Sequence, residues 1–294
     1  MSTQNAEQIA EWNGALGQRW AELQQEIDGI VVPFGEAALK LAAPQMGERV
    51  IDVGCGCGDT SIELARRVGD AGRVLGVDVS QPMLEVARAR AGLQGRPNLV
   101  FRQADASEAD LPSGTDLLFS RFGVMFFGQP VAALRHLRAS MRSGGRCVFV
   151  CWRAPRDNPW AMTPLVAARN VMGLTPAPTD PNAPGPFAFA DDERLRAILS
   201  DAGFEKIDVT RFDAPVFLGA TPRAAAENAV RVGPTSRLVR EVGIENLPTI
   251  IDAIERTFTA LAAPDGQVRA PEWLDLAGGR VEPIGLRALR TTAG

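Results

Sequence analysis

Three glycines on alternate positions separate an apolar run from an amphipathic segment in RVIDVGCGCGDTSIELARRVG (49–69). Because glycine has no Cβ, such a turn lets a ligand approach the backbone closely. A helix that starts there would also direct its free N–H groups and the positive end of its dipole toward the ligand. Gly54, Gly56 and Gly58 therefore predict a ligand site where a strand meets a helix.

Three aspartates end successive strand-like runs: Asp52 before the first glycine, Asp78 after RVLGV and Asp105 after VFRQA. Open parallel sheets bind ligands at the carboxyl ends of their strands, so these side chains are expected at one edge. Carboxylates suit a ligand with hydroxyls, an amine and a positive centre, and they suit a pyrophosphate poorly.

The glycine spacing differs from the dinucleotide-binding pattern G-x-G-x-x-G. Counted from Gly54 or Gly56, the third glycine of that pattern would fall on Asp59 or Ser61. A nicotinamide-dependent oxidoreductase is one of the functions that we consider, and this spacing disfavours it.

The elements that position these residues alternate regularly in the middle of the chain. Strands are predicted at 49–54, 73–79, 99–105, 116–122 and 146–152. Helical sequences lie between them, which predicts a parallel sheet with helices on both faces. Thr60 and Glu63 have the spacing of a capping box at the start of the first helix.

The flanking segments have a different character. The expected organisation is an N-terminal helical lid (1–45), a ligand-binding core (46–152), a proline-rich lid connection (153–190), a continuation of the core (191–219), a helical insertion (220–264) and a last strand with a tail (265–294). Periodicity is weak in the last segment, and only one strand, near 268–276, is predicted there.

Composition limits the functional class. The chain has 294 residues, 46% of them hydrophobic, and a formal net charge of −4, which is typical of a globular protein that does not bind nucleic acid. No apolar run is long enough to cross a membrane and the N-terminus lacks signal-peptide features, so a cytoplasmic monomer or homodimer is expected. Four cysteines are too few for a disulfide scaffold and indicate reduced thiols.

Several segments, in order, resemble the motifs of class I S-adenosylmethionine-dependent methyltransferases: VIDVGCGCGDTSIELA, RVLGVDVSQPMLEVARAR, VFRQADA, SGGRCVFVCW and DAGFEKIDV. The resemblance covers 49 to about 210. FSRFGVMFF followed by CWR and NPW resembles small-molecule enzymes near the ubiquinone/menaquinone C-methyltransferase branch. The resemblance implies a doubly wound, mostly parallel seven-stranded sheet, with N-terminal helices and helical insertions that form a substrate lid.

The resemblance also implies roles for individual residues. Asp52 and the backbone of the glycine turn would hold the methionine end of S-adenosylmethionine, Asp78 its ribose hydroxyls, and Asp105 its adenine amino group. The other implied cofactor-binding residues are Gly54, Cys55, Gly56, Gly58, Val79, Met83, Ala104, Ala106, Ser120 and Arg121. Candidate walls of the acceptor pocket are Trp20, Phe122, Phe126, Trp152 and Trp160.

The sequence offers few catalytic bases, because His136 is its only histidine and it has no tyrosine. His136 lies in a predicted crossover helix away from the strand ends, and no catalytic residue is predicted. No metal site is predicted either, since Cys55 and Cys57 in the glycine turn lie far from Cys147 and Cys151 on one strand, and buried thiols explain them. We expect methyl transfer to a small apolar or aromatic molecule, with S-adenosylhomocysteine as product, that depends on orientation and exclusion of water. The alternative is a homologue that binds the cofactor for a non-methylating reaction or for regulation.

Overall fold

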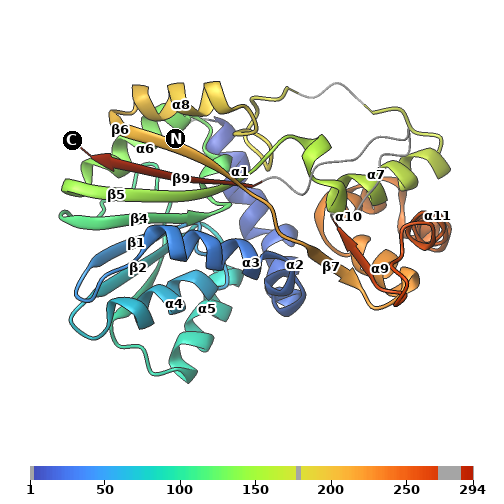
Figure 1. Ribbon diagram of the computed structural model, residues 1–294, viewed down its shortest axis with the longest axis horizontal. Helices are drawn as coiled ribbons and strands as arrows, with labels where there is room; N and C mark the ends of the chain where they lie inside the picture. Colours follow the sequence, from blue (N-terminus) through green and yellow to red (C-terminus); the bar gives the residue numbers. More distant parts are fainter. Residues whose placement is uncertain (1–2, 177–179, 271–285, 294) are drawn as a thin grey trace.

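The computed structural model describes residues 3–176, 180–270 and 286–293, which form two lobes (Figure 1). One lobe holds the main sheet and the helices that cover it. The other lobe is mostly helical. The N-terminal helices, drawn in dark blue, run along the junction of the two lobes (Figure 1).

Five parallel strands form most of the main sheet. They are β1 (Arg49–Val53), β2 (Arg73–Asp78), β3 (Leu99–Gln103), β4 (Thr115–Arg121) and β5 (Met141–Trp152). Their order is β3-β2-β1-β4-β5, so the winding reverses between β1 and β4. Both of these strands are largely buried, which accounts for their continuous apolar sequences. The α/β class with a mostly parallel sheet is confirmed.

Two antiparallel pairings extend the sheet. β9 (Leu286–Ala293) lies between β5 and β6 (Phe204–Phe212) and is antiparallel to both. A strand begins at the predicted position: β8 (Val268–Ala270) pairs with β7 (Val216–Gly219) in a separate sheet. The prediction that this segment holds a single strand is wrong, because β9 is a second one. The remainder of that predicted strand lies outside the described residues. β9 was not predicted because LRALRTTA lacks the two-residue alternation of a half-buried strand.

Four helices pack around the main sheet: α4 (Asp59–Val68), α5 (Gln81–Leu93), α6 (Pro130–Ala139) and α8 (Asp192–Asp201). α4 and α5 contact the first three strands, and α8 contacts β6 and α6. The predicted capping box is wrong. α4 begins after Gly58, the Thr60 hydroxyl donates to Asp52, and Glu63 pairs with Arg66.

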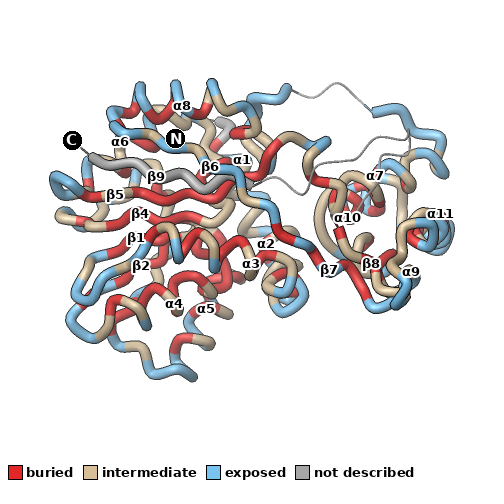
Figure 2. The backbone as a smooth tube through the Cα atoms, in the orientation of Figure 1, coloured by how far each residue is buried: buried red, intermediate tan, exposed pale blue. Residues whose placement is uncertain are grey.

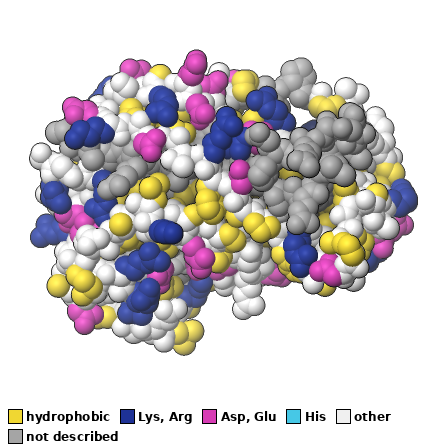
Figure 3. Space-filling model, viewed as in Figure 1, with side chains coloured by type: hydrophobic (Ala, Val, Ile, Leu, Met, Phe, Trp, Pro, Cys, Tyr) yellow, Lys and Arg dark blue, Asp and Glu magenta, His cyan; other side chains and the backbone are white. Residues whose placement is uncertain are grey.

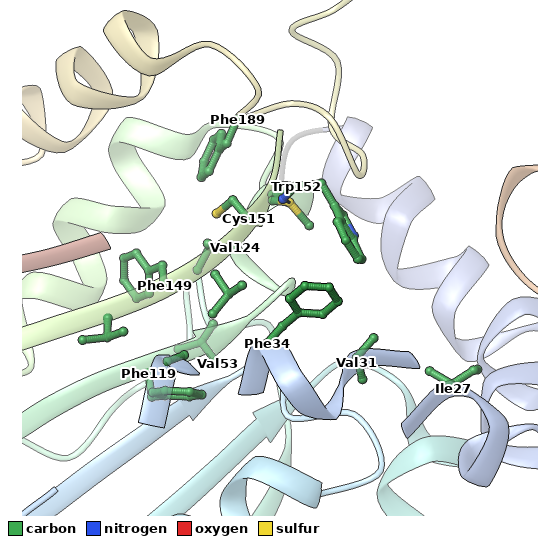
Figure 4. Packing of buried hydrophobic residues seen from close by; sticks show 14 of the residues in the cluster. Ile27, Val31, Phe34, Val53, Phe119, Val124, Phe149, Cys151, Trp152 and Phe189 are labelled. Atoms are coloured by element: carbon green, nitrogen blue, oxygen red, sulfur yellow. Dashed lines mark hydrogen bonds between the residues drawn. The ribbon is translucent and has the colours of Figure 1, made fainter. Parts of the chain in front are cut away.

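The first 42 residues form three helices: α1 (Thr3–Asn13), α2 (Ala15–Glu22) and α3 (Gln24–Ala42). α3 contacts β4 and β5. Its Phe34 is buried and points toward Trp152 of β5, with the ring centroids 5.6 Å apart (Figure 4). α3 is therefore part of the core and does not only cover it.

The helical lobe contains α7 (Pro159–Val171), α9 (Pro222–Ala229), α10 (Gly233–Val242) and α11 (Leu247–Thr259). Two short 3₁₀ turns contact these helices, η2 (Pro155–Asp157) and η3 (Ile244–Asn246), and a third, η1 (Val124–Phe126), contacts β5. α7 packs against α10 and α11, so the segment predicted as a proline-rich connection contains a helix of this lobe. Pro159 is compatible with that helix because it occupies the first turn, where no N–H bond is needed.

Buried residues concentrate in the strands and the helix sides that face them, whereas α8 and α11 expose their outer sides (Figure 2). On the face shown in Figure 3, basic and acidic side chains are interspersed. Among the described helices, none combines the length and the apolar character needed to cross a membrane.

Candidate functional site

The glycine turn after β1 has a backbone that glycine adopts without strain. Gly54, Gly56 and Gly58 have φ angles of +68°, +53° and +83°. A Cβ on Gly54 would lie 2.6 Å from the Cα of Gly123, and one on Gly56 would lie 2.8 Å from the Cε of Met83. Side chains at Gly54 and Gly56 would thus collide with neighbouring protein atoms.

Asp78, at the end of β2, presents a fixed carboxylate beside this turn. One of its oxygens accepts a hydrogen bond from the backbone N–H of Gly56, and the other accepts one from Ser80, both at 2.8 Å. Burial raises the pKa of Asp78, and these backbone donors oppose the rise. Because a carboxylate oxygen can accept more than one hydrogen bond, Asp78 can also accept from ligand hydroxyls.

Asp52, which was predicted to hold the ligand, does not line the cavity. It is wholly buried, and one carboxylate oxygen accepts from the hydroxyls of Thr60 at 2.7 Å and Ser61 at 2.6 Å. Burial raises the pKa of Asp52 to about 6, although both hydroxyls oppose the rise. Asp52 therefore joins β1 to the first turn of α4 and supports the glycine turn from the core.

Gly58 and Ser120, two further predicted cofactor-binding residues, also do not line the cavity. Gly58 is the N-cap residue of α4 and packs so closely that a Cβ would lie 2.8 Å from the Phe101 ring. The Ser120 hydroxyl donates to the carbonyl of Val53 at 2.7 Å and accepts from the N–H of Gly123 at 3.2 Å. Both residues shape the turn without facing the cavity.

Two asparagines of α1, neither of them predicted, reach the ends of β2 and β3. The Asn5 amide donates to the carboxylate of Asp105. The Asn13 amide donates to the carbonyl of Val79 at 2.7 Å, and its oxygen accepts from Gln103 at 3.0 Å. Nothing in the sequence marks these residues, because an asparagine in a helix commonly faces solvent.

A network of four charged residues fixes Arg121 at the edge of the cavity. Arg121 pairs with Asp59 of α4 at 2.9 Å, and Arg90 of α5 pairs with Asp28 of α3 at 3.1 Å. Arg90 also approaches Asp59 at 3.5 Å, so the two pairs are linked. Burial, and next the charge of Asp59, raise the pKa of Asp28, a cavity residue that was not predicted.

These elements border a cavity of about 1590 Å³. Ligand pockets commonly measure about 300–1,000 Å³, so this cavity has room for two ligands. The predicted cofactor residues in its lining are Gly54, Cys55, Gly56, Asp78, Val79, Met83, Ala104, Asp105, Ala106 and Arg121. All the predicted acceptor residues also line it: Trp20, Phe122, Phe126, Trp152 and Trp160.

An aromatic wall forms one part of the lining. Phe122, directly after β4, has a φ of +66°, a conformation that costs a non-glycine residue free energy. Its ring stacks on Trp152 with centroids 4.2 Å apart and planes 6° apart, and Trp152 contacts Trp160 at 5.1 Å. Trp12, which was not predicted, packs edge to face on Trp20 at 5.5 Å.

The described residues that line this cavity include no histidine. His136 lies on α6 with its Nε2 2.8 Å from the carbonyl of Ala109, and it does not line the cavity. The four cysteines are free and buried, and the described part of the chain contains no group of three or more side chains that could hold a metal ion. The site instead combines carboxylates, bare backbone and aromatic rings, a set that fits a ligand with hydroxyls and a positive centre.

Comparison with known proteins agrees with this geometry. Residues 50–145 match a family model described as a methyltransferase domain. The chain is 34% identical over 118 residues to the aklanonic acid methyltransferase DauC of a Streptomyces species. These aligned residues make up 40% of this chain and 54% of that protein. It is 27% identical over 181 residues to the ubiquinone/menaquinone biosynthesis C-methyltransferase UbiE of Shewanella frigidimarina. That alignment covers 58% of this chain and 72% of the UbiE chain. This chain therefore spans about half the length of the first relative.

Among solved structures, the YcgJ protein of Bacillus subtilis has the same fold, with a TM-score of 0.55 and 18% identity over 88% of this chain and 97% of that one. The family match runs from β1 into β5 and includes the glycine turn, Asp78 and Asp105. The resemblance predicted from the sequence motifs is confirmed. Residues 50–145 of the chain thus match the methyltransferase domain family.

Proposed function

We propose that this protein transfers the methyl group of S-adenosylmethionine to a small apolar or aromatic acceptor and leaves S-adenosylhomocysteine. The observation that carries the proposal is the Asp78 carboxylate, fixed by the backbone N–H of Gly56 at the edge of a cavity with room for two ligands. A carboxylate in this position is suited to the two ribose hydroxyls of a nucleoside.

The remaining cofactor contacts follow from the lining. The bare backbone at Gly54 and Gly56 and the guanidinium of Arg121 would hold the amino-acid end of the cofactor, and Asp105 would accept from its adenine amino group. Apolar contacts to the base would come from Val79, Met83, Ala104 and Ala106. The neighbouring carboxylates also favour the positive charge of the sulfonium.

The chemistry asks little of acid–base groups. When bound, the cofactor supplies a methyl group on a positively charged sulfur, whose departure needs no proton. The chain has to align the acceptor atom with that methyl group and exclude water, which together can lower the barrier by several kcal/mol. Phe122, Trp152 and Trp160 would hold a flat acceptor, since their rings already pack on one another.

The N-terminal helices and the 153–190 segment would form the lid of this site. The hydrogen bonds of Asn5 and Asn13 to the ends of β2 and β3 support this role for α1. Trp20 of α2 and Trp160 of α7 line the cavity from two separate segments. Closure of these segments would keep water away from the acceptor.

The acceptor class is supported by the apolar lining and by the names of the relatives, which act on aklanonic acid or on ubiquinone and menaquinone precursors. We further propose that the protein acts in the cytoplasm as a monomer or homodimer, without nucleic acid. The free, buried cysteines and the net charge of −4 support this part of the proposal.

Calorimetry with S-adenosylhomocysteine tests the proposal directly. The wild type should bind it, and Asp78→Asn should bind it about tenfold to a hundredfold more weakly, because hydrogen bonds to a charged group contribute about 1.5–3 kcal/mol. Asp70→Asn, in an exposed turn after α4, removes the same charge away from the cavity and should bind normally. If neither the wild type nor the control binds, or if Asp78→Asn binds as tightly as the wild type, the proposal fails.

Acceptor methylation needs a separate measurement. Incubation with methyl-labelled S-adenosylmethionine and a panel of aromatic hydroxy compounds should transfer label to at least one compound. Cofactor binding without transfer to any member of a broad panel would favour the alternative, a cofactor-binding protein with a non-methylating reaction or a regulatory role.

A further inference from the structure

The cavity lining changes its charge between the sheet and the helical lobe. Beside the strand ends its charged residues include Asp28, Asp78 and Asp105. Where α2 approaches α10, the charged lining residues are Arg19, Arg231, Arg237, Arg240 and Glu241. The lining there holds four cations and one carboxylate, and two carboxylates outside the lining, Glu22 and Glu26, act on Arg19 and Arg231.

Three of these arginines interact through their charges. The charges of Arg231 and Arg240 act on Arg19, and we call these three residues the arginine cluster; Arg237 pairs with Glu241 at 3.0 Å. The three belong to different segments, because Arg19 is on α2, Arg231 precedes α10 and Arg240 is near the end of α10. The Arg19 Nε donates to the carbonyl of Arg231 at 2.7 Å, which holds the segments together.

The counter-charge at the cluster is weak. Arg231 pairs with Glu26 at 3.1 Å, but their side chains are 46% and 45% exposed, so water screens the pair. For Arg240, the described residues provide no ion pair within 4.0 Å. The pKa of Arg19 is lowered by burial and then by the charges of Arg240 and Arg231, and the charge of Glu22 opposes this by a smaller amount. An anion placed among these guanidiniums would relieve their mutual repulsion.

Apolar surface adjoins the cluster. Trp20 follows Arg19 in α2, Val232 follows Arg231, and both residues line the same cavity. Trp20 is packed against Trp12, another lining residue. The cavity at this end can therefore contact a flat apolar body and a charged group of one molecule.

We propose that the arginine cluster binds a carboxylate group on the methyl acceptor, so that the protein selects aromatic acids over their neutral analogues. This inference rests on the proposed function, since it concerns the acceptor of that reaction. The planar guanidinium suits this task because it can bind two carboxylate oxygens at once. The positive end of the cavity would also orient the acceptor, with its anionic end away from the strand-end aspartates.

Calorimetric titration of 2-naphthoate and 2-naphthamide into the protein saturated with S-adenosylhomocysteine tests the inference. The two probes share a ring system and differ in charge. We expect 2-naphthoate to bind at least about tenfold more tightly, because charge-assisted hydrogen bonds are roughly twice as strong as neutral ones. Raising the ionic strength should reduce this ratio.

Variants locate the anion. Arg19→Gln and Arg240→Gln should each reduce the naphthoate-to-naphthamide affinity ratio several-fold, and the double variant should bring it close to one. Arg88→Gln, on the exposed side of α5 and outside the cavity lining, is the matched control and should retain the wild-type ratio. S-adenosylhomocysteine affinity should be unchanged in every variant.

Equal affinities of the wild type for the two probes, or no binding of 2-naphthoate, would overturn this inference while normal S-adenosylhomocysteine binding upholds the proposed function. A double variant that keeps the wild-type ratio would also overturn it. Absence of S-adenosylhomocysteine binding in the wild type is a different result, because it contradicts the proposed function itself.

Discussion

The two sides of the cavity are built differently. On the sheet side, contacts depend on backbone geometry: the glycines of the β1 turn have positive φ angles, and Asp78 is fixed by N–H groups within a few residues of a strand end. On the helical side, they depend on side chains from segments far apart in the chain, such as Arg19 and Arg231. The sheet side can therefore be recognised in a short motif, whereas the helical side is assembled only by the tertiary fold.

The largest effect that would sharpen this comparison is expected for Gly54→Ala. Its Cβ would lie 2.6 Å from the Cα of Gly123, and its φ of +68° disfavours a side chain. We expect S-adenosylhomocysteine affinity in calorimetry to fall by more than about a hundredfold, or about 3 kcal/mol. Gly95→Ala is the control, because Gly95 has a φ of +58° with nothing within 4 Å of its Cβ position.

The control should lose only about 1–2 kcal/mol of stability, the cost of the left-handed conformation, and should bind the ligand normally. Thermal unfolding of both variants separates a folding defect from a binding defect. Normal affinity in a folded Gly54→Ala protein would show that bare backbone is not needed on the sheet side.

An intermediate effect is expected from Asp52 on the pH dependence of stability. Its folded-state pKa of about 6 lies above the ordinary value of 3.8, so its contribution to stability is present below pH 3.8 and is lost as the pH rises through 6. Between pH 4.5 and 7.5 this amounts to about 2 kcal/mol. Urea unfolding of the ligand-free protein should show this loss in the wild type and not in Asp52→Asn, which keeps an acceptor for the hydroxyls of Thr60 and Ser61.

The comparison of the two proteins at both pH values cancels the titration of other groups. Equal pH slopes for wild type and variant would mean that Asp52 titrates as an ordinary carboxyl, and its assignment to the core behind the glycine turn would then need revision.

The smallest effect is expected for His136→Ala. The imidazole contacts the carbonyl of Ala109 and does not line the cavity. Turnover and S-adenosylhomocysteine affinity should stay within about twofold of the wild type, since deleting one partly exposed hydrogen bond costs about 1 kcal/mol of stability at most. Lost turnover with intact ligand binding would instead place a base on this helix.

The sequence was sufficient for the sheet side because each feature there is local. Gly56 and Asp78 lie at strand ends, and strand ends can be read from apolar runs and the turn residues that follow them. Asp52 shows the limit of this reasoning. It has the expected position in the motif, but the hydroxyls of Thr60 and Ser61 hold it in the core, and a linear pattern cannot show which way a strand-end side chain points.

The other differences have related causes. Asn5, Asn13 and Asp28 were missed because they lie on helices whose docking decides what they contact. α7 was missed because its prolines suggested a connection, although Pro159 begins the helix. Tertiary contacts, which no short pattern contains, settle each of these cases.

The distribution of tryptophan gives the protein an optical property that follows from the aromatic wall. Four of its five tryptophans, Trp12, Trp20, Trp152 and Trp160, line the cavity, and the chain has no tyrosine to add to the ultraviolet emission. Most of the intrinsic fluorescence should therefore originate from the cavity lining. A compound that enters between these indoles should quench or shift the emission, so acceptor candidates can be screened on unlabelled protein.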